Sequence, residues 1–309
     1  MTSVPSPTKR PFAETAAKIL GDHTATILDI GARWAVDDET ESWYRVPPLG
    51  HLVGFEPDAN ECARLNAAAR PGQRFVALAL GGTSGPRTLH LTQDPACASL
   101  YPPAQAAARL VWRDVMEKTG EMEIETTRLD EWVRTANEPP IIFMKLDVQG
   151  AELEILQGAG EVLDGCLGLQ VEVEFNALYQ DQPLFADVDQ FLRTRGFALW
   201  RLSQLAHCSE RPLPSLTRSE THFYSGIATL MAAGAGRLVS ADAVYFRDYQ
   251  ALEQSSAGVR AALMLASLLD AADEHDGRDA CLRHLHTVLH PWLSEEQRQA
   301  LATTSGATS

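Results

Sequence analysis

Apolar runs that end in an acidic residue recur along the first half of the sequence. The first is 26–32 (Thr-Ile-Leu-Asp-Ile-Gly-Ala) and the second is 51–58 (His-Leu-Val-Gly-Phe-Glu-Pro-Asp). A third run covers 74–80, and a fourth, at 141–148, ends in Leu-Asp-Val. Short apolar runs bounded by turn residues are typical of strands buried in a parallel sheet. The pattern therefore predicts parallel strands that deliver polar side chains at their carboxyl ends.

Helical segments alternate with these runs. Asp58 is a predicted helix cap, because its side chain can accept from the free N–H groups of a first turn. The predicted helices are 12–20, 58–69, 150–156 and 184–195, and further strands are predicted at 167–175, 197–202 and 223–231. Strands and helices that alternate over some 200 residues predict an α/β fold with a doubly wound sheet.

Two parts of the sequence depart from this alternation. The segment 83–125 contains alternating stretches at 87–92 and 121–126 and a helical composition at 104–118, so we interpret it as an insertion. Together with 201–221 it is expected to cover a pocket, because loops on a rigid scaffold usually hold the residues that determine substrate specificity. Beyond Gly234 the pattern is rich in Ala and Leu, with helices expected at 249–272, 277–289 and 294–302 and no further strand.

These patterns predict an N-terminal segment and lead-in helix at 1–25, a sheet domain at 26–233 and a helical C-terminal extension at 234–309. The extension is expected to pack on the sheet domain and to offer a surface for homo-oligomer formation, because the Ala- and Leu-rich faces of its helices are too apolar to stay exposed to water as a continuous patch. A separate small helical domain is the alternative.

Charge and cysteine content narrow the possible partners. The chain has 309 residues with 26 basic and 41 acidic side chains, a net charge of −15, which disfavours nucleic acid and anionic lipid surfaces. Its five cysteines are scattered and form no Cys-x-x-Cys pair, so no disulfide framework or zinc site is indicated. No signal peptide or membrane-spanning run is evident. We therefore expect a cytoplasmic protein.

Three carboxylates are expected to meet at one edge of the sheet. Asp29, Glu56 and Asp147 end the first, second and fourth predicted strands, and ligands of open α/β sheets bind outside the carboxyl ends of the strands. Glu56 follows Asp29 by 27 residues, close to the spacing at which an acid binds the ribose hydroxyls of a nucleoside. A helix-initiating acid beside Pro57 is the other interpretation of Glu56.

The first loop limits which nucleoside fits. A dinucleotide dehydrogenase needs Gly-x-Gly-x-x-Gly to hold pyrophosphate on a helix N-terminus, and here only Gly31 is present. A nucleoside without phosphates, such as S-adenosylmethionine, needs fewer glycines and tolerates Asp29 near its cationic end. A noncatalytic protein that keeps the nucleoside fold for binding or scaffolding is the competing hypothesis. The retention of three site carboxylates argues against it.

Several motifs resemble a known family. Asp29-Ile-Gly-Ala, Gly54-Phe-Glu-Pro-Asp and the block 144–159, which begins Met-Lys-Leu-Asp-Val-Gln-Gly-Ala-Glu, are similar to FkbM-type S-adenosylmethionine-dependent methyltransferases. The resemblance covers about 27–196. It implies a Rossmann-like seven-stranded methyltransferase sheet and O-methylation of a hydroxyl on a sugar, polysaccharide precursor or natural product. This sequence differs from the family pattern at two positions. The second glycine of the first loop is absent, and Gln149 stands where many members carry Glu.

The resemblance also implies residue roles. Asp29, Gly31 and Ala32 would line the methionine part of S-adenosyl-L-methionine, and Glu56 with Pro57 would bind its ribose. Ala79 and Leu80 would contact the adenine edge, and Asp147 would lie beside the transferred methyl. The acceptor would be a small molecule or a glycan.

The base that receives the hydroxyl proton is left open. Candidates are Asp147, Glu152, Glu172, Glu174 and His222, of which Asp147, Glu174 and His222 are preferred. Alternation places Glu172 and Glu174 on one face of their strand. Burying two like charges together raises a pKa, which suits a base or a divalent metal, although no metal is implied by the pattern. Glu152 is equally well explained as a favourable acid in a first helical turn.

Overall fold

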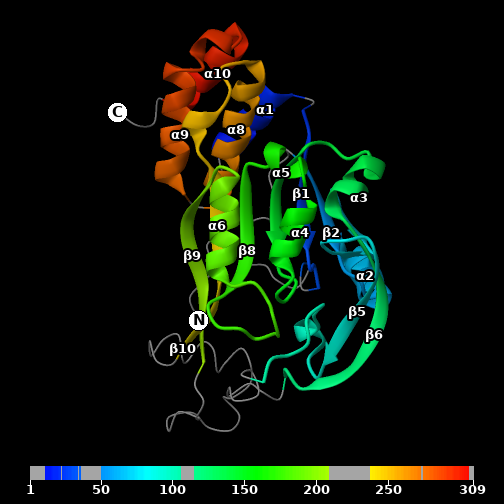
Figure 1. Cartoon of the computed structure of the whole chain (residues 1–309). Coiled ribbons are helices and arrows are strands. Elements are labelled where there is room, and N and C mark those ends of the chain that lie inside the picture. Colours follow the sequence, from blue (N-terminus) through cyan, green and yellow to red (C-terminus); the bar gives the residue numbers. More distant parts are fainter. Residues whose placement is uncertain are drawn as a thin grey trace, which may run out of the picture.

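The computed structural model describes residues 11–21, 23–33, 35, 50–105, 115–208, 237–272 and 274–305. A seven-stranded sheet forms the middle layer, and helices cover both of its faces (Figure 1). The sheet contains β1 (Ala25–Ile30), β2 (Gly50–Phe55), β3 (Gln73–Val76), β7 (Ile141–Leu146), β8 (Gly168–Glu174), β9 (Phe197–Cys208) and β10 (Arg237–Arg247). Their order is β3-β2-β1-β7-β8-β10-β9, and β10 alone runs antiparallel to its neighbours. This topology confirms the predicted Rossmann-like sheet.

Burial on both faces explains the apolar runs in the sequence. All six residues of β1 are buried, because side chains that alternate along the strand meet a hydrophobic cluster on either side. One cluster contains Ile27 and packs α1 (Pro11–Leu20), α2 (Ala59–Ala68) and α8 (Ser256–Ala271) against the sheet. The other contains Leu28 and packs α3 (Leu129–Ala136), α4 (Glu152–Gly158), α5 (Val162–Gly165) and α6 (Phe185–Thr194).

The C-terminal helices belong to the first of these clusters. Leu265 of α8 is fully buried in the same cluster as Phe143 of β7 and Phe246 of β10. The helices α9 (His275–Thr287) and α10 (Glu295–Ser305) extend this packing, with short 3-10 turns at Tyr249–Ala251 and His290–Trp292. Figure 1 shows these helices grouped with α1. The prediction that they pack on the sheet is confirmed, and homo-oligomer formation through them stays a prediction.

The expectation of no strand beyond Gly234 is wrong. The strand β10 lies between β8 and β9 and pairs antiparallel with both of them. Its first half carries the polar residues Ser240 and Asp242, and only residues 243–246 form a fully buried run. The apolar signal is therefore too short to recognise from the sequence. The strand predicted at 223–231 lies outside the described residues.

A second sheet corresponds to the predicted insertion. It contains β4 (Ala79–Leu80), β6 (Lys118–Thr127) and β5 (Gly85–Thr92), in the order β4-β6-β5. The predicted strand 74–80 is in fact two strands, because β3 joins the large sheet while β4 pairs with β6. The predicted helix 104–118 falls mostly outside the described residues, and its last residue already belongs to β6. The two sheets together shape the pocket described below.

Candidate active site

A cavity of about 1210 Å³ lies at the carboxyl edge of the large sheet. The ends of β1, β2, β7 and β8 supply its floor through Gly31, Glu56, Asp147 and Glu172. The second sheet and the following 3-10 turn (Pro95–Cys97) supply a wall. Because β1 lies between β2 and β7, the predicted carboxylates Glu56 and Asp147 reach the same cavity from the two sides of β1.

The turn after β1 requires a glycine. Gly31 has φ +90, and a Cβ at this position would lie 1.9 Å from the carbonyl oxygen of Asp147. Its N–H donates to the Phe55 carbonyl of β2. The bare backbone thus brings the β1 loop against the end of β7.

Glu56 is buried and faces the cavity beside α2. Its Oε1 accepts from the Asp58 N–H at 2.9 Å, while Asp58 caps α2 by accepting from Asn60 and Glu61. Burial raises the pKa of the Glu56 carboxyl, and the Asp58 N–H and the Arg33 charge partly oppose this shift. Glu56 therefore has one oxygen committed to the turn and a second that can accept from a ligand.

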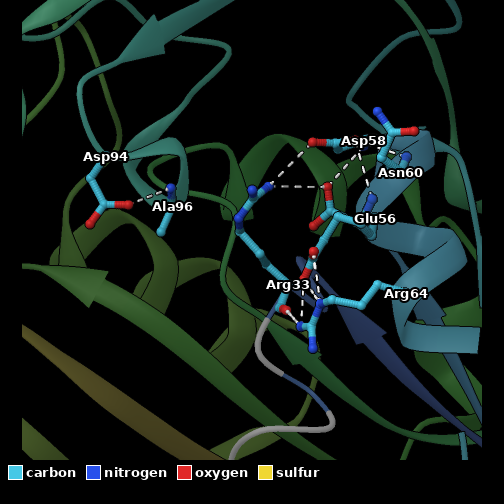
Figure 2. A network of polar contacts seen from close by, with 8 residues as sticks. Arg33, Glu56, Asp58, Asn60, Arg64, Asp94 and Ala96 are labelled. Carbon is cyan, nitrogen blue, oxygen red and sulfur yellow. Dashed lines mark hydrogen bonds and ion pairs between the residues drawn. The ribbon is translucent and has the colours of Figure 1, made fainter. Parts of the chain in front are cut away.

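Arg33 lies close to both Glu56 and Asp58. Its Nη1 is 3.8 Å from Glu56 Oε1 and 3.9 Å from Asp58 Oδ2. Figure 2 shows this guanidinium between the start of α2 and the turn at Asp94–Ala96, where Asp94 accepts from the Ala96 N–H. The positive charge of Arg33 thus stabilises the negative charges of two carboxylates at one end of the cavity.

Lys145 links the two carboxylates at the floor. Its Nζ lies 3.8 Å from Asp29 Oδ1 and 3.7 Å from Asp147 Oδ2. Asp29 is buried behind the cavity, whereas the Asp147 side chain is 35% exposed. The cation is placed to stabilise the charge on both side chains.

Gln149 joins Asp147 to Glu172. Its side-chain amide donates to Asp147 Oδ1 at 2.9 Å and to Glu172 Oε2 at 2.7 Å. Its own Oε1 accepts from the hydroxyl of Tyr179, and its backbone carbonyl accepts from Ser99. Burial raises the pKa of Glu172 well above the ordinary range, and the charge of Asp147 raises it further. Glu172 can therefore hold a proton beside Asp147.

Comparison with known proteins places this chain in a family. The family model for the Methyltransferase FkbM domain matches residues 29–199, which is more than half of the chain. This chain belongs to the FkbM methyltransferase family. The 2-O-methyltransferase NoeI of Sinorhizobium fredii (strain NBRC 101917 / NGR234) is 28% identical over 173 residues, which cover 53% of this chain and 69% of NoeI. The prediction of a methyltransferase is therefore confirmed.

Similarity to solved structures is weaker. Magnesium protoporphyrin IX methyltransferase (ChlM) from Synechocystis PCC 6803 gives a TM-score of 0.34 at 11% identity, over 79% of this chain and 87% of that one. PKMT2 from Rickettsia typhi gives 0.34 at 10% identity, over 81% and 58%. Scores this low carry no argument about the site. Separately, none of the described helices is long and apolar enough to cross a membrane.

The residues predicted to bind the cofactor in this FkbM family member fall into two groups, those that line the cavity and those that do not. Gly31, Glu56, Pro57, Ala79, Leu80 and Asp147 line it. Asp29 and Ala32 are buried and do not line it, and Asp29 lies near the lining residue Lys145. The roles assigned to them stay predictions.

The remaining residues predicted as candidate bases do not line the cavity or lie outside the described residues. Glu152 is 3% exposed, and its Oε1 accepts from the N–H groups of Val148 and Gly150, so it holds the turn after β7. Burial raises the pKa of Glu152 to about 7. Glu174 is on the same strand face as Glu172, as predicted, but it is 2% exposed and is not among the lining residues. His222 lies outside the described residues.

Sequence reasoning missed three site residues. Lys145 lies two residues before Asp147 on the same strand, so alternation alone would have placed both side chains on one face. Gln149 stands where many family members carry Glu, and its amide links two acids in a way that the substitution did not indicate. Tyr179 stands in a loop with no periodic pattern and left no signal. Among the described residues, no three His, Cys, Asp or Glu side chains form a metal-ligating group.

Proposed function

We propose that this FkbM family member transfers a methyl group from S-adenosylmethionine to a hydroxyl of a sugar, a polysaccharide precursor or another natural product. The observation that carries the proposal is the convergence of Glu56 and Asp147 on one cavity from opposite sides of β1. The name of the relative NoeI, a 2-O-methyltransferase, supports oxygen as the acceptor atom.

The residues present fit this donor. Glu56 is buried and aims an acceptor oxygen at the cavity, which suits the ribose hydroxyls. The Gly31 backbone lines the cavity, and Lys145 lies there between Asp29 and Asp147, near the place expected for the charged methionine end. Pro57, Ala79 and Leu80 give apolar contact for the adenine. A pyrophosphate would find a single glycine and two acidic neighbours, Glu56 and Asp58, so a nicotinamide dinucleotide fits poorly.

When bound, S-adenosylmethionine supplies an electrophilic methyl on a sulfonium. Asp147 is assigned to accept the proton of the acceptor hydroxyl while the new oxygen–carbon bond forms and the carbon–sulfur bond breaks. Gln149 and Lys145 hold the Asp147 carboxylate from two directions. Alignment of nucleophile and leaving group contributes up to about 7–11 kcal/mol in well-oriented systems, and a base adds roughly 10²–10⁴-fold.

Calorimetric titration with three ligands tests the proposal. S-adenosylmethionine and S-adenosylhomocysteine are expected to bind the full chain, whereas NAD is not. Glu56→Ala is expected to weaken both bound ligands at least tenfold with an unchanged circular dichroism spectrum. Glu61→Ala removes an acid in the first turn of α2 that forms an ion pair with Arg64, and it is the control. Binding of NAD alone, or equal affinity in both variants, would overturn the assignment of Glu56.

A further inference from the structure

The ribbon formed by β5 and β6 has one apolar face, and this face is turned into the cavity. Leu89 is paired with Met122, and the neighbouring pair joins Arg87 to Ile124. Leu89, Leu91, Met122 and Ile124 all line the cavity. The intervening residues Thr88, Glu121, Glu123 and Glu125 are exposed and do not line it. Because the side-chain period of a strand is two, the register itself fixes which face the cavity sees.

These four apolar side chains do not belong to the protein's core. None of them is a member of the three hydrophobic clusters formed by the described residues. Met122 is 46% exposed, which is unusual for so large an apolar side chain beside a cavity. A sheet face that is apolar, lines the cavity and belongs to none of these clusters in the described part of the chain indicates a ligand that covers it.

The ribbon is joined directly to the reacting end of the cavity. Ser99 exchanges backbone hydrogen bonds with His90 of β5, and its hydroxyl donates to the Gln149 carbonyl at 2.6 Å. Gln149 in turn contacts Asp147. The apolar face therefore continues from the place where the acceptor hydroxyl is expected.

Charge sets a second condition on the ligand. Glu56, Asp58, Asp147, Glu172 and Asp242 line the cavity. The cations among the described lining residues are Arg33 and Lys145, and each already lies near two carboxylates. An anionic acceptor such as a sugar phosphate would be repelled by this surface.

We infer that the methyl acceptor is an uncharged molecule with an apolar arm, an alkyl or acyl chain, which lies against Leu89, Leu91, Met122 and Ile124 while its hydroxyl meets Asp147. This inference rests on the proposed function and adds the class of acceptor. The cavity volume of about 1210 Å³ agrees with it. Pockets for one small ligand usually enclose about 300–1,000 Å³, so there is room for an arm beside the donor.

The apolar arm is tested first by binding, independently of turnover. The fluorescent, uncharged probe N-phenyl-1-naphthylamine is titrated into the full-length protein. The double variant Leu89→Ser/Met122→Ser is expected to bind it at least tenfold more weakly than the wild type. The double variant Thr88→Ser/Glu123→Ser changes the outer face of the same strands and is expected to stay within twofold. Equal affinity in the two double variants would overturn the inference.

Displacement of the probe then tests the chemistry of the ligand. Octyl glucoside below its micelle concentration is expected to displace the probe, whereas methyl glucoside and octyl phosphate are not. Displacement by octyl phosphate at the same concentration would refute the requirement for an uncharged ligand. Displacement by methyl glucoside would refute the need for an apolar arm.

Calorimetry with S-adenosylmethionine on the same variants separates acceptor from donor. The Leu89→Ser/Met122→Ser protein is expected to keep its donor affinity within twofold. A tenfold loss would assign the face to the adenine of the donor and overturn the inference. A wild-type protein that binds the probe on this face but binds no S-adenosylmethionine would refute the proposed function while leaving the apolar subsite in place.

Discussion

The Tyr179 hydroxyl lies 2.9 Å from Oε1 of Gln149. Tyr179 is fully buried, and burial raises its pKa, so the hydroxyl keeps its proton and can donate to that oxygen. The same hydroxyl lies 2.9 Å from the Cys97 carbonyl oxygen, a second acceptor for its single proton. The Gln149 amide is thus contacted at its oxygen by the phenol and at its nitrogen by Asp147 and Glu172.

Removal of the Gln149 side chain tests this arrangement. Gln149 has φ 60, a conformation that glycine adopts without strain, so Gln149→Gly deletes the amide and keeps the backbone. We expect kcat to fall about 10-fold to 10²-fold, with donor affinity unchanged. The acid limb of the pH–rate profile should move to higher pH, because Glu172, whose pKa burial already raises, loses an amide that donates to its carboxylate.

Asp181→Gly is the matched control for this variant. Asp181 also has a positive φ, and it is exposed in the loop after β8. Its replacement should leave kcat and the pH profile unchanged. If Gln149→Gly behaved like this control, Gln149 would have no part in positioning the carboxylates.

Replacement of Asp147 by Asn removes a charge and keeps the shape of the side chain. Because a positioned base contributes roughly 10²–10⁴-fold, we expect turnover to fall at least about 10²-fold while donor affinity is nearly preserved. Steady-state kinetics and calorimetry on the same preparation measure the two effects. Asp181→Asn serves as the control, since asparagine tolerates the same backbone conformation. Wild-type turnover in Asp147→Asn would make Asp147 a structural residue. Loss of wild-type activity on chelation, restored by Mg²⁺, would instead favour a metal role.

Gly31→Ala should destabilise the protein more than an ordinary left-handed glycine replacement. Both Gly31 (φ +90) and Gly21 (φ +59) have positive φ, but only at Gly31 would the new Cβ collide with backbone, at 1.9 Å from the Asp147 oxygen. We expect a loss of about 1–2 kcal/mol for Gly21→Ala and more than about 3 kcal/mol for Gly31→Ala. Urea unfolding followed by circular dichroism measures both. Equal losses would mean that the loop relaxes away from β7.

The buried Glu152 makes stability depend on pH. Its pKa rises from 4.5 in the unfolded chain to about 7 in the folded protein, chiefly because of burial. Between these values the folded state binds more protons, so the free energy of unfolding falls as pH rises, and the full cost is present above about pH 7. Glu152→Gln can still accept from Val148 and Gly150 but does not titrate.

We therefore expect Glu152→Gln to be more stable than the wild type at pH 8, by on the order of 1 kcal/mol, and to show a smaller decline in stability between pH 4.5 and 7. Urea unfolding at several pH values measures this. Glu154→Gln, on the same helix turn, is the comparison variant, since Glu154 pairs with Arg87 instead of two backbone N–H groups. A Glu152→Gln curve parallel to that of the wild type would show that Glu152 does not titrate in this window.

The sequence by itself determined the parallel strands of the large sheet and the carboxyl ends of its central strands. Strands that are buried on both faces of a sheet have continuous apolar runs, which the sequence displays. Because the carboxyl ends of parallel strands meet at one edge of the sheet, Glu56 and Asp147 could be placed at a common site in advance. Gly31 could be recognised too, because a glycine directly after an apolar run indicates a sharp turn of the backbone.

Only the tertiary structure decided the contacts made between segments distant in the sequence. Tyr179 and Ser99 reach Gln149 from loops that have no periodic pattern, and hydrogen bonds of this kind leave no trace in local composition. The strand β10 was hidden because Ser240 and Asp242 interrupt its apolar run near the cavity. The direction of the β5–β6 apolar face likewise depends on β4 and β6 pairing beside the large sheet. Local residue preferences determine strands and helices, whereas long-range packing determines which faces of them meet a ligand.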